Sequence, residues 1–526
     1  MDHLIVALDS FPTQSDGQHS ESTYDAELKA YVSMISQLPD STHAAIRVNP
    51  SPAFEVCMNY TSEQLPQLSL AKILHQNRNT LGFLTVLDIL VGSKKELDQQ
   101  VLSKIVEFLN DFDPIAVRYA GTSFRSLLEN VISGSLFPVR RGILKKNKTL
   151  FCYNLLTLWI QATVALKLAS NALLRLDPSG TVFTSIHVPL LRLAADTATY
   201  EPVLDVIDCD ITAFPQSSGP KEMAILCKKD LSPTLFVNPT TGLTELVKAT
   251  AVLEYNALRG IIYTSQRNWS KSRDAFELVI THPAKERGIS KIMTDTHKKW
   301  VLVSLLCDGR APSLPTTVSQ SAKVSYSALS TLYMEVASLF DTNNVSKLRE
   351  VYSDNQITWQ EDGNQNLLDE VMTSYQQWQI INLRDVYSQV PVSTIQSLTL
   401  SAGTGERLGN ITHVIAFIQK MIDQGMLNGH LELGHDGGDT YLVFDEIKFI
   451  LGEREFATQI ATSHHRVEAL SSRYKAENER LSGSKEYVKH LIREQKRAAE
   501  KDGQDQGIGV DGAEEEDLMT GIMSTV

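Results

Sequence analysis

The feature that most constrains the fold of this chain is a change of hydrophobic period within residues 374–446. The first part of this stretch carries three apolar patterns of helical spacing, and the second part alternates with the period of a β-strand. The helical patterns predict helices over residues 383–390, 392–398 and 412–424, with Gly425 as the left-handed stop of the last one. The alternation predicts a hairpin of strands 427–433 and 441–444. Three helices followed by a hairpin is the order of elements in a winged helix.

Each predicted helix rests on a named apolar stripe. The first stripe ends at Pro391 and consists of Leu383, Val386, Tyr387 and Val390. The second, shorter stripe consists of Val392, Ile395 and Leu398. The third consists of Ile411, Ile415, Ile418 and Ile422.

Upstream of this region the chain carries pairs of helical patterns joined by short polar turns. The best-formed pair covers residues 254–283, where Gly260, Tyr263 and Phe276 follow the spacing of a tetratricopeptide repeat and Ser272 occupies a small-residue position. Gly260 should let the second helix approach, while the two aromatic rings fill the space between the helices. Such pairs bury their apolar faces only by stacking, so the sequence predicts an α-solenoid.

The stretch VSTIQSLTLS…ITHVIAFIQKMIDQGMLNGHLEL resembles the winged-helix half of the PCI domain. This family occurs in subunits of the proteasome lid, the COP9 signalosome and a translation initiation factor. The resemblance is carried by the residues Ile395, Met421, Ile422, Gly425, Leu427 and Gly429. Gln396 stands where the family usually has alanine. A solenoid that leads into a winged helix is the PCI architecture, so the expected fold is mainly α, with TPR-like helical repeats, a winged-helix subdomain and a long C-terminal helix.

Three further segments resemble PCI subunits of the COP9 signalosome. They read FTSIHVPLLRLA…YEPVLDVID, GIIYTSQRNW…AFELVITHPA and HKKWVLVSLLCDGRAPSLPTTVSQ. The resemblance implies a non-catalytic scaffold subunit of a complex that removes the ubiquitin-like modifier NEDD from cullins, working in cytoplasm and nucleus. A PCI subunit of the 26S proteasome lid is the alternative, because it shares the architecture.

These patterns divide the chain into five parts. We expect N-terminal helical repeats over residues 1–180, TPR-like repeats over 181–372 and the winged-helix half of the PCI domain over 373–446. A C-terminal assembly helix should cover residues 447–500. The remaining residues, 501–526, are rich in Gly, Asp and Glu and predict a disordered acidic tail.

The predicted hairpin is the first candidate interaction site. Unpaired strand edges recruit further strands, so we expect this element to pair with the winged helix of another PCI subunit. The residues assigned to this contact are Leu427, Leu431, Leu433, Tyr441 and Val443.

The second candidate site is a narrow apolar seam on the helix predicted over residues 454–493. Its members recur with a heptad period among charged residues, and they are Ile460, Val467, Leu470, Tyr474, Leu481 and Val488. A solvated helix folded back on its own domain is the alternative. A seam this regular on so polar a helix is more typical of packing against helices of other subunits.

Charge and composition weigh against other partners. The net charge of −13 opposes nucleic-acid binding, and the third winged-helix helix offers only Lys420, beside Asp423. Residues 150–174 are long enough to cross a bilayer, but Lys167 and scattered amides favour a helix buried among other helices. The five cysteines are widely spaced and odd in number, which is typical of reduced thiols. We therefore expect no membrane, nucleic-acid or small-molecule partner.

No catalytic, metal or cofactor site is predicted. His430 and His435 are five residues apart, and the adjacent His464 and His465 point about 100° apart on a helix, so neither pair suits a metal. The glycines at 403, 405 and 409 do not match G-x-G-x-x-G, because the last one is a residue late. The sequence therefore predicts that the chain is not an enzyme.

Overall fold

The computed structural model describes residues 8, 10–12, 21–58, 79–92, 99–133, 148–215, 225–283, 289–342, 344–433, 439–445, 452–483 and 485–502. The chain forms two compact units. The first comprises Met1–Leu427 and Leu431–Val443, and the second comprises Asn428–His430 and Phe444–Val526. Of the predicted acidic tail, residues 503–526 lie outside the described residues.

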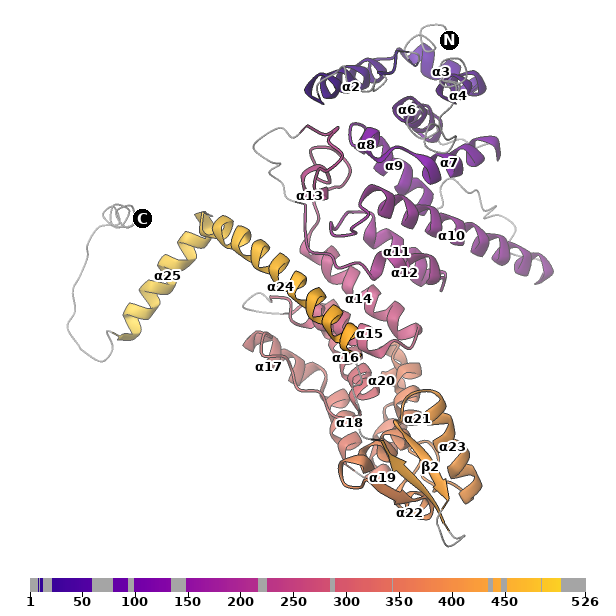
Figure 1. Ribbon diagram of the computed structural model, residues 1–526, viewed down its shortest axis with the longest axis vertical. Coiled ribbons are helices and arrows are strands. Elements are labelled where there is room, and N and C mark those ends of the chain that lie inside the picture. Colours follow the sequence, from indigo (N-terminus) through magenta and orange to yellow (C-terminus); the bar gives the residue numbers. More distant parts are fainter. Residues whose placement is uncertain are drawn as a thin grey trace. The chain divides into compact units, whose positions relative to one another are not determined.

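The first unit is a succession of helices that pack on their neighbours along the chain (Figure 1). Its N-terminal part contains α2 (Glu21–Ser36), α3 (Asp40–Val48), α4 (Ser51–Met58), α6 (Thr80–Val91), α7 (Gln99–Asp111), α8 (Pro114–Val117), α9 (Gly121–Ile132) and α10 (Lys148–Leu176). The middle part contains α11 (His187–Asp196), α12 (Leu204–Ile207), α13 (Pro233–Phe236), α14 (Ala249–Ser265), α15 (Trp269–Ile280), α16 (Lys291–Asp308), α17 (Gln320–Leu329) and α18 (Thr331–Asp341). The predicted mainly helical solenoid is thus confirmed.

The pair α14–α15 shows why these residues form a repeat. A Cβ placed on Gly260 would lie 2.2–2.4 Å from the ring of Phe276, so only glycine lets α15 come this close. Ser272, which is fully buried, donates from its Oγ to the carbonyl oxygen of Gly260 at 2.9 Å. Tyr263 and Phe276 are also buried. The predicted roles of the glycine, the small residue and the two rings are confirmed.

The helix α10 covers the segment considered as a membrane span. Its described side chains from residue 162 onward include a buried row against the other helices, namely Ala165, Leu166, Ala169, Ala172 and Leu173. Lys167 is exposed. Among the described residues, no helix is long and apolar enough to cross a membrane. The prediction of a helix packed among other helices is confirmed for this part of α10.

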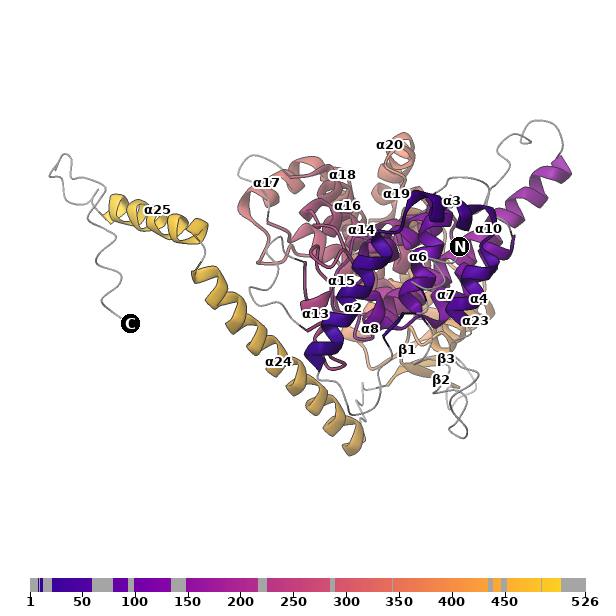
Figure 2. The same cartoon turned by 90° about the horizontal axis from the view of Figure 1, so that it is seen from above.

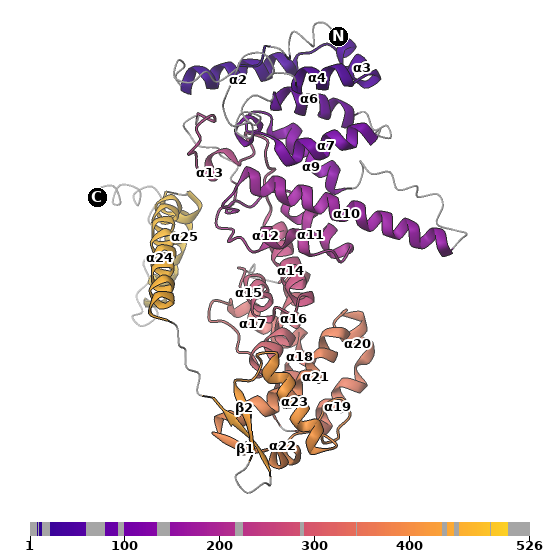
Figure 3. The same cartoon turned by 45° about the vertical axis from the view of Figure 1, so that its right-hand side comes forward.

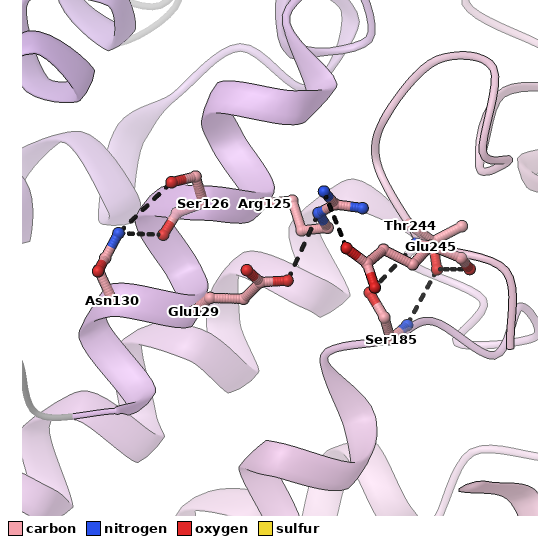
Figure 4. Close-up of polar contacts among 7 residues, drawn as sticks. All are labelled: Arg125, Ser126, Glu129, Asn130, Ser185, Thr244 and Glu245. Atoms are coloured by element: carbon pink, nitrogen blue, oxygen red, sulfur yellow. Dashed lines mark hydrogen bonds and ion pairs between the residues drawn. The ribbon is translucent and has the colours of Figure 1, made fainter. Parts of the chain in front are cut away.

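An irregular segment, residues 225–248, ties the middle of the first unit to its N-terminal helices. Arg118 donates to the carbonyl oxygens of Leu226 and Lys228 at 2.9 and 2.8 Å, and its guanidinium lies 3.9 Å from the centre of the Phe236 ring. The far end of the segment is fixed by the contacts in Figure 4: Arg125 on α9 pairs with Glu245 at 3.3 Å. The repeats are therefore cross-linked by segments distant in sequence.

The winged helix follows α19 (Val345–Asp354) and α20 (Gln356–Glu361). It contains α21 (Gln365–Asn382), α22 (Val392–Leu398), α23 (Ile411–Asp423), and the strands β1 (Gln389–Pro391), β2 (Gly429–Leu433) and β3 (Thr440–Phe444) (Figure 3). Gly425 has a φ of +69°, as expected for the stop of α23. Three helices and a sheet are present, but two details of the prediction are wrong.

The first error concerns the predicted helix over residues 383–390. The first helix of the subdomain is α21, which ends at Asn382, and a single 3₁₀ turn, Leu383–Asp385, follows it. Val390 lies instead in β1, paired with Leu442 of β3. Val386 and Tyr387, assigned to the same apolar stripe, are exposed. The apolar spacing of residues 383–390 is thus helical, but residues 389–391 form a strand because they pair with β3, about fifty residues downstream.

The second error concerns the buried face of α23. Ile411, placed in the predicted stripe, is 42% exposed. The buried positions are Val414, Ile418 and Met421, so Ile418 of the predicted stripe is buried as expected, but the buried face is turned by roughly 60° from that stripe. Gln396, which replaces the family's alanine, donates to the carbonyl oxygens of Leu408 and Gly409 at 2.7 and 2.9 Å. It thereby fixes the loop between α22 and α23.

The second unit contains α24 (Glu453–Ser482) and α25 (Lys485–Asp502). The prediction of a single helix over residues 454–493 is therefore wrong, because the helix is interrupted after Gly483 (Figures 1 and 2). Gly483 itself keeps a right-handed helical conformation, with φ −81° and ψ −5°.

Candidate interaction site

The winged-helix sheet has the strand order β1–β3–β2, so β3 is central and β2 lies at one end. Leu442 and Phe444 of β3 are buried, together with Val390 of β1. Ile395 on α22 and Ile418 on α23 are buried as well. The sheet is therefore three-stranded, and among the described residues only one side of β2 has a strand neighbour.

The five hairpin residues chosen from the sequence occupy different environments. Leu427 is buried and precedes β2, whereas Leu433, at the end of β2, is 84% exposed. Leu431, Tyr441 and Val443 are half-buried. Leu433 therefore offers the most apolar surface at the strand end, and Leu427 belongs to the core. Their assignment to a partner contact stays a prediction.

The entry to the hairpin is closed by polar contacts. The backbone N–H of Asp445 donates to the carbonyl oxygen of Asn428 at 3.2 Å. The Nδ1 atom of His430 lies 2.9 Å from Oδ1 of the same aspartate. His430 therefore serves an ion-pair or hydrogen-bond contact within the hairpin. His435 lies outside the described residues.

A partly buried polar cluster connects the start of the winged helix to the preceding repeats. Lys298 on α16 donates to both carboxylate oxygens of Asp362 at 2.8 Å, and the Tyr333 hydroxyl on α18 donates to the same group at 2.8 Å. Lys299 donates to the amide oxygen of Asn364 at 2.6 Å, and burial lowers the pKa of this lysine. Asp362 and Asn364 form the turn before α21. The cluster therefore fixes the start of the winged helix.

This cluster was not predicted from the sequence, although its two lysines stand next to each other in the segment HKKWVLVSLL. Two successive lysines on one helix usually indicate solvent exposure. Here Lys298 and Lys299 directly precede Trp300, which is buried in the repeat core. Their partners lie more than sixty residues downstream, so only the folded chain identifies them.

The C-terminal seam is exposed along its whole length. Its six predicted members have exposed fractions of 54% for Ile460, 65% for Val467, 60% for Leu470, 74% for Tyr474, 48% for Leu481 and 36% for Val488. Phe456 and Leu491 continue the pattern and are 54% and 45% exposed. Scattered apolar residues on a surface are ordinary, but a continuous apolar line on a helix indicates a binding face.

The described residues contain no group of three or more His, Cys, Asp and Glu side chains placed to hold a metal ion. His464 and His465 are exposed on α24. Two other histidines are buried: His187 contacts Thr184, and the His297 ring stacks on Tyr326 at 4.3 Å. Burial lowers the pKa of each to about 4, so both are neutral near pH 7 and act as packing groups.

Comparison with known proteins gives consistent matches. Residues 148–322 match the family model of the N-terminal helical repeats of COP9 signalosome complex subunit 3. A protein of Neurospora crassa with the name COP9 signalosome complex subunit 3 is 34% identical over 84% of this chain and 87% of its own length. The protein of the same name from Emericella nidulans is 28% identical over 73% of this chain and 76% of its own length. The signalosome resemblance of the three sequence segments is confirmed.

Proposed function

Because the chain belongs to the family of COP9 signalosome complex subunit 3, we propose that it is a non-catalytic scaffold subunit of the COP9 signalosome. In this proposal the complex removes the modifier NEDD from cullins, and this chain holds other subunits in place. The observation that carries the proposal is the exposed apolar seam on α24, a helix whose sequence is otherwise mostly polar. The named relatives favour the signalosome over the lid of the 26S proteasome.

Two elements would make the contacts. The open side of β2 would pair with the winged helix of another PCI subunit, since a strand edge satisfies its backbone groups by adding a strand. The seam of α24 and α25 would pack against helices of further subunits. The first contact uses backbone hydrogen bonds and the second uses apolar burial, so each can be removed separately.

A pair of charges in the seam tests the assembly role. We expect Val467→Glu together with Leu481→Glu to release the chain from the complex, because each buried aliphatic side chain contributes roughly 1.5–3 kcal/mol. The melting temperature of the isolated chain should stay unchanged, since both residues are exposed. The measurement is recovery of the other subunits on the tagged chain.

The matched control adds the same two charges away from the seam. Thr462 and Ser482 are exposed on α24 and lie on its outer side in the heptad count. Thr462→Glu with Ser482→Glu should therefore leave assembly intact. Recovery of the complex at parental levels with the seam variant would refute the assembly role.

The absence of a catalytic role is also a proposal. It is supported by the scattered positions of the histidines and by the use of the buried ones in packing. The purified chain should hydrolyse no isopeptide-linked or nucleotide substrate, whereas the assembled complex should remove NEDD from cullins. Turnover by the chain alone would overturn this part.

We further propose that the protein works in cytoplasm and nucleus. The proposal is supported by Cys57, Cys209, Cys227 and Cys307, which are free thiols. Cell fractionation with a tagged chain tests it. Recovery in a secretory compartment would contradict it.

A further inference from the structure

The first unit contains a cleft where the turn between α14 and α15 meets the ends of α16 and α21. Its volume is about 580 Å³, a size that suits a small molecule or a few side chains of a partner. It is lined by Arg267 in the turn, Trp269 at the start of α15, Cys307 on α16, Trp378 on α21 and Met426 after α23. The cleft therefore lies where the TPR-like repeats join the winged helix.

Two tryptophans form fixed apolar walls of this cleft. Trp269 and Trp378 are half-buried, and both pack on the core cluster of the repeats. A Cβ placed on Gly309, which ends α16, would lie 2.2 Å from the Trp378 ring, so this ring packs directly against the glycine backbone. Met426 is 38% exposed. Tryptophan and methionine are enriched in protein interfaces, and a ring already held in place loses little conformational entropy on binding.

Arg267 is the only charged side chain among the described residues that line the cleft, and its backbone is strained. Its φ is +56°, and its N–H donates to the carbonyl oxygen of Thr264 at 3.0 Å. The N–H of Asn268 donates to the carbonyl oxygen of Tyr263 at 2.9 Å. This is the helix stop that glycine usually makes. Strain of this kind is concentrated at functional sites, so the arginine side chain itself is the feature to explain.

The guanidinium of Arg267 can bind a second anion. It donates to Oε2 of Glu370 on α21 at 3.1 Å, and no other hydrogen bond or ion pair of this side chain occurs among the described residues. The side chain is 71% exposed, so its remaining donors face water. Arginine presents five N–H donors in a planar fork, which is enough for two carboxylates.

We propose that the cleft binds a short extended segment of a partner protein in which a large apolar side chain lies next to Asp or Glu. The apolar side chain packs against Trp269 and Trp378, and the carboxylate pairs with Arg267. Charge complementarity carries this choice, because no acidic side chain is among the described lining residues and their one cation is only partly used. The site goes beyond the proposed assembly contacts, which use β2 and the C-terminal seam.

A nucleotide is the other ligand that suits aromatic rings beside an arginine, through base stacking and a phosphate contact. A phosphate group with up to two negative charges would lie next to the Glu370 carboxylate, which repels it more strongly than it repels a single carboxylate. The described lining residues also offer no second cation to offset that repulsion. The acidic peptide segment is therefore the better fit.

Selection of peptides on the full chain tests the chemistry of the partner. From a phage-displayed library of short random peptides, the parent should retain those with Asp or Glu next to an aromatic or aliphatic residue. Synthetic copies should bind Arg267→Gly at least about tenfold more weakly, since the charged hydrogen bonds are lost. Glycine is favoured at this left-handed position, so the melting temperature should not fall. Weaker binding by an equally stable chain identifies Arg267 as a binding residue rather than a structural one.

The matched control is a second exposed arginine that pairs with a glutamate. Arg192 on α11 contacts Glu254 and is not among the residues that line the cleft. Arg192→Gln should therefore bind the selected peptides as the parent does, whereas Arg267→Gln should not. Equal loss in both variants would overturn the proposed contact.

Met426 allows the charge of the ligand to be tested without removing Arg267. Because its side chain is partly exposed, both Met426→Glu and Met426→Lys should fold. Met426→Glu should weaken peptide binding and Met426→Lys should not, and the difference should shrink as salt screens the charges. Equal binding by the two variants would show that charge does not select the ligand.

Three further results would overturn the proposal. The first is a library selection in which the parent enriches no acidic and apolar peptides over the Arg267→Gly chain. The second is binding of ATP that Arg267→Gly abolishes while no peptide is selected, which would identify a nucleotide site. The third is a dimer of the parent in sedimentation analysis that is absent with Arg267→Gly, which would show that a second copy of the chain covers the cleft.

Discussion

Gly260 decides how closely α15 packs on α14, and a single methyl group should disturb that packing. In Gly260→Ala the new Cβ meets the ring of Phe276, which is 1% exposed and enclosed by other core residues. Overpacking costs roughly 1–3 kcal/mol, while the better helix propensity of alanine returns about 1 kcal/mol. We therefore expect a net loss of up to about 2 kcal/mol in the free energy of unfolding, measured with urea.

Gly409 provides the comparison for this substitution. A Cβ placed there meets no atom within 4 Å, so Gly409→Ala should change the free energy of unfolding by less than about 0.5 kcal/mol. If the two variants unfolded at the same urea concentration, the close approach of α15 to Gly260 would not exist.

The two buried histidines should make stability depend on pH above the range of the carboxylates. Burial lowers the pKa of His187 and His297 from 6.5 to about 4, so the unfolded chain binds more protons between these values. The stability contributed by each neutral ring is present above pH 6.5 and is lost as the pH falls toward 4. Each histidine contributes a slope of up to about 1.4 kcal/mol per pH unit.

Removal of one histidine isolates its share of this slope. His297→Gln should give a flatter dependence of the unfolding free energy on pH between 6.5 and 5, even if its absolute stability is lower. A slope equal to that of the parent would mean that His297 is protonated in the folded chain.

At the scale of elements, the sequence predicted the helices whose packing depends on the spacing of nearby residues. The α14–α15 pair followed from Gly260 and Phe276, which lie sixteen residues apart and face each other across one turn. The strand β1 could not be found in this way, because Val390 is buried by pairing with Leu442 rather than by its own neighbours. The seam was visible as a heptad pattern, whereas the interruption beside Gly483 leaves that pattern unchanged. The spacing of apolar residues shows which face of a helix is apolar, but it does not show where the helix is interrupted.

The sheet order changes which residue tests the proposed strand pairing. Val443→Pro is uninformative, because β3 is central and a proline there breaks the sheet. Leu433 at the end of β2 is 84% exposed, and a charge on an edge strand opposes the addition of another strand. Leu433→Lys should therefore weaken recovery of other PCI subunits and leave the melting temperature unchanged.

A second exposed leucine of the same subdomain serves as the reference for Leu433→Lys. Leu398 at the end of α22 is 50% exposed and lies outside the sheet. Leu398→Lys introduces the same charge and should assemble as the parent does. Strand pairing through β2 would be refuted by equal recovery of partner subunits with both variants.

For the whole molecule, the distribution of burial separates what stabilises the chain from what the chain offers to partners. The repeats and the winged helix contain continuous buried clusters, tied together by Arg118, Lys298 and their partners. The seam on α24 and α25 contributes exposed apolar residues instead. An apolar face that stays in water lowers solubility without stabilising the fold, which is the reason for proposing that a partner covers it.

This separation predicts that α24 and α25 can be removed without unfolding the rest of the chain. A chain that stops after Glu453 loses no residue that the described part of α24 and α25 shows as buried, so its melting temperature should stay within about 2 °C of the parent, the shift that less than about 1 kcal/mol produces in a protein of this size. Recovery of the complex should nevertheless fall sharply.

A chain that stops after Gln424 is the contrast, because it also removes the buried Leu442 and Phe444 and leaves β1 without its strand partner. That shorter chain should melt several degrees lower, since each lost core side chain costs roughly 2–5 kcal/mol. If the truncation after Glu453 lowered the melting temperature as much, α24 and α25 would be part of the core, and their seam would face this chain rather than a partner.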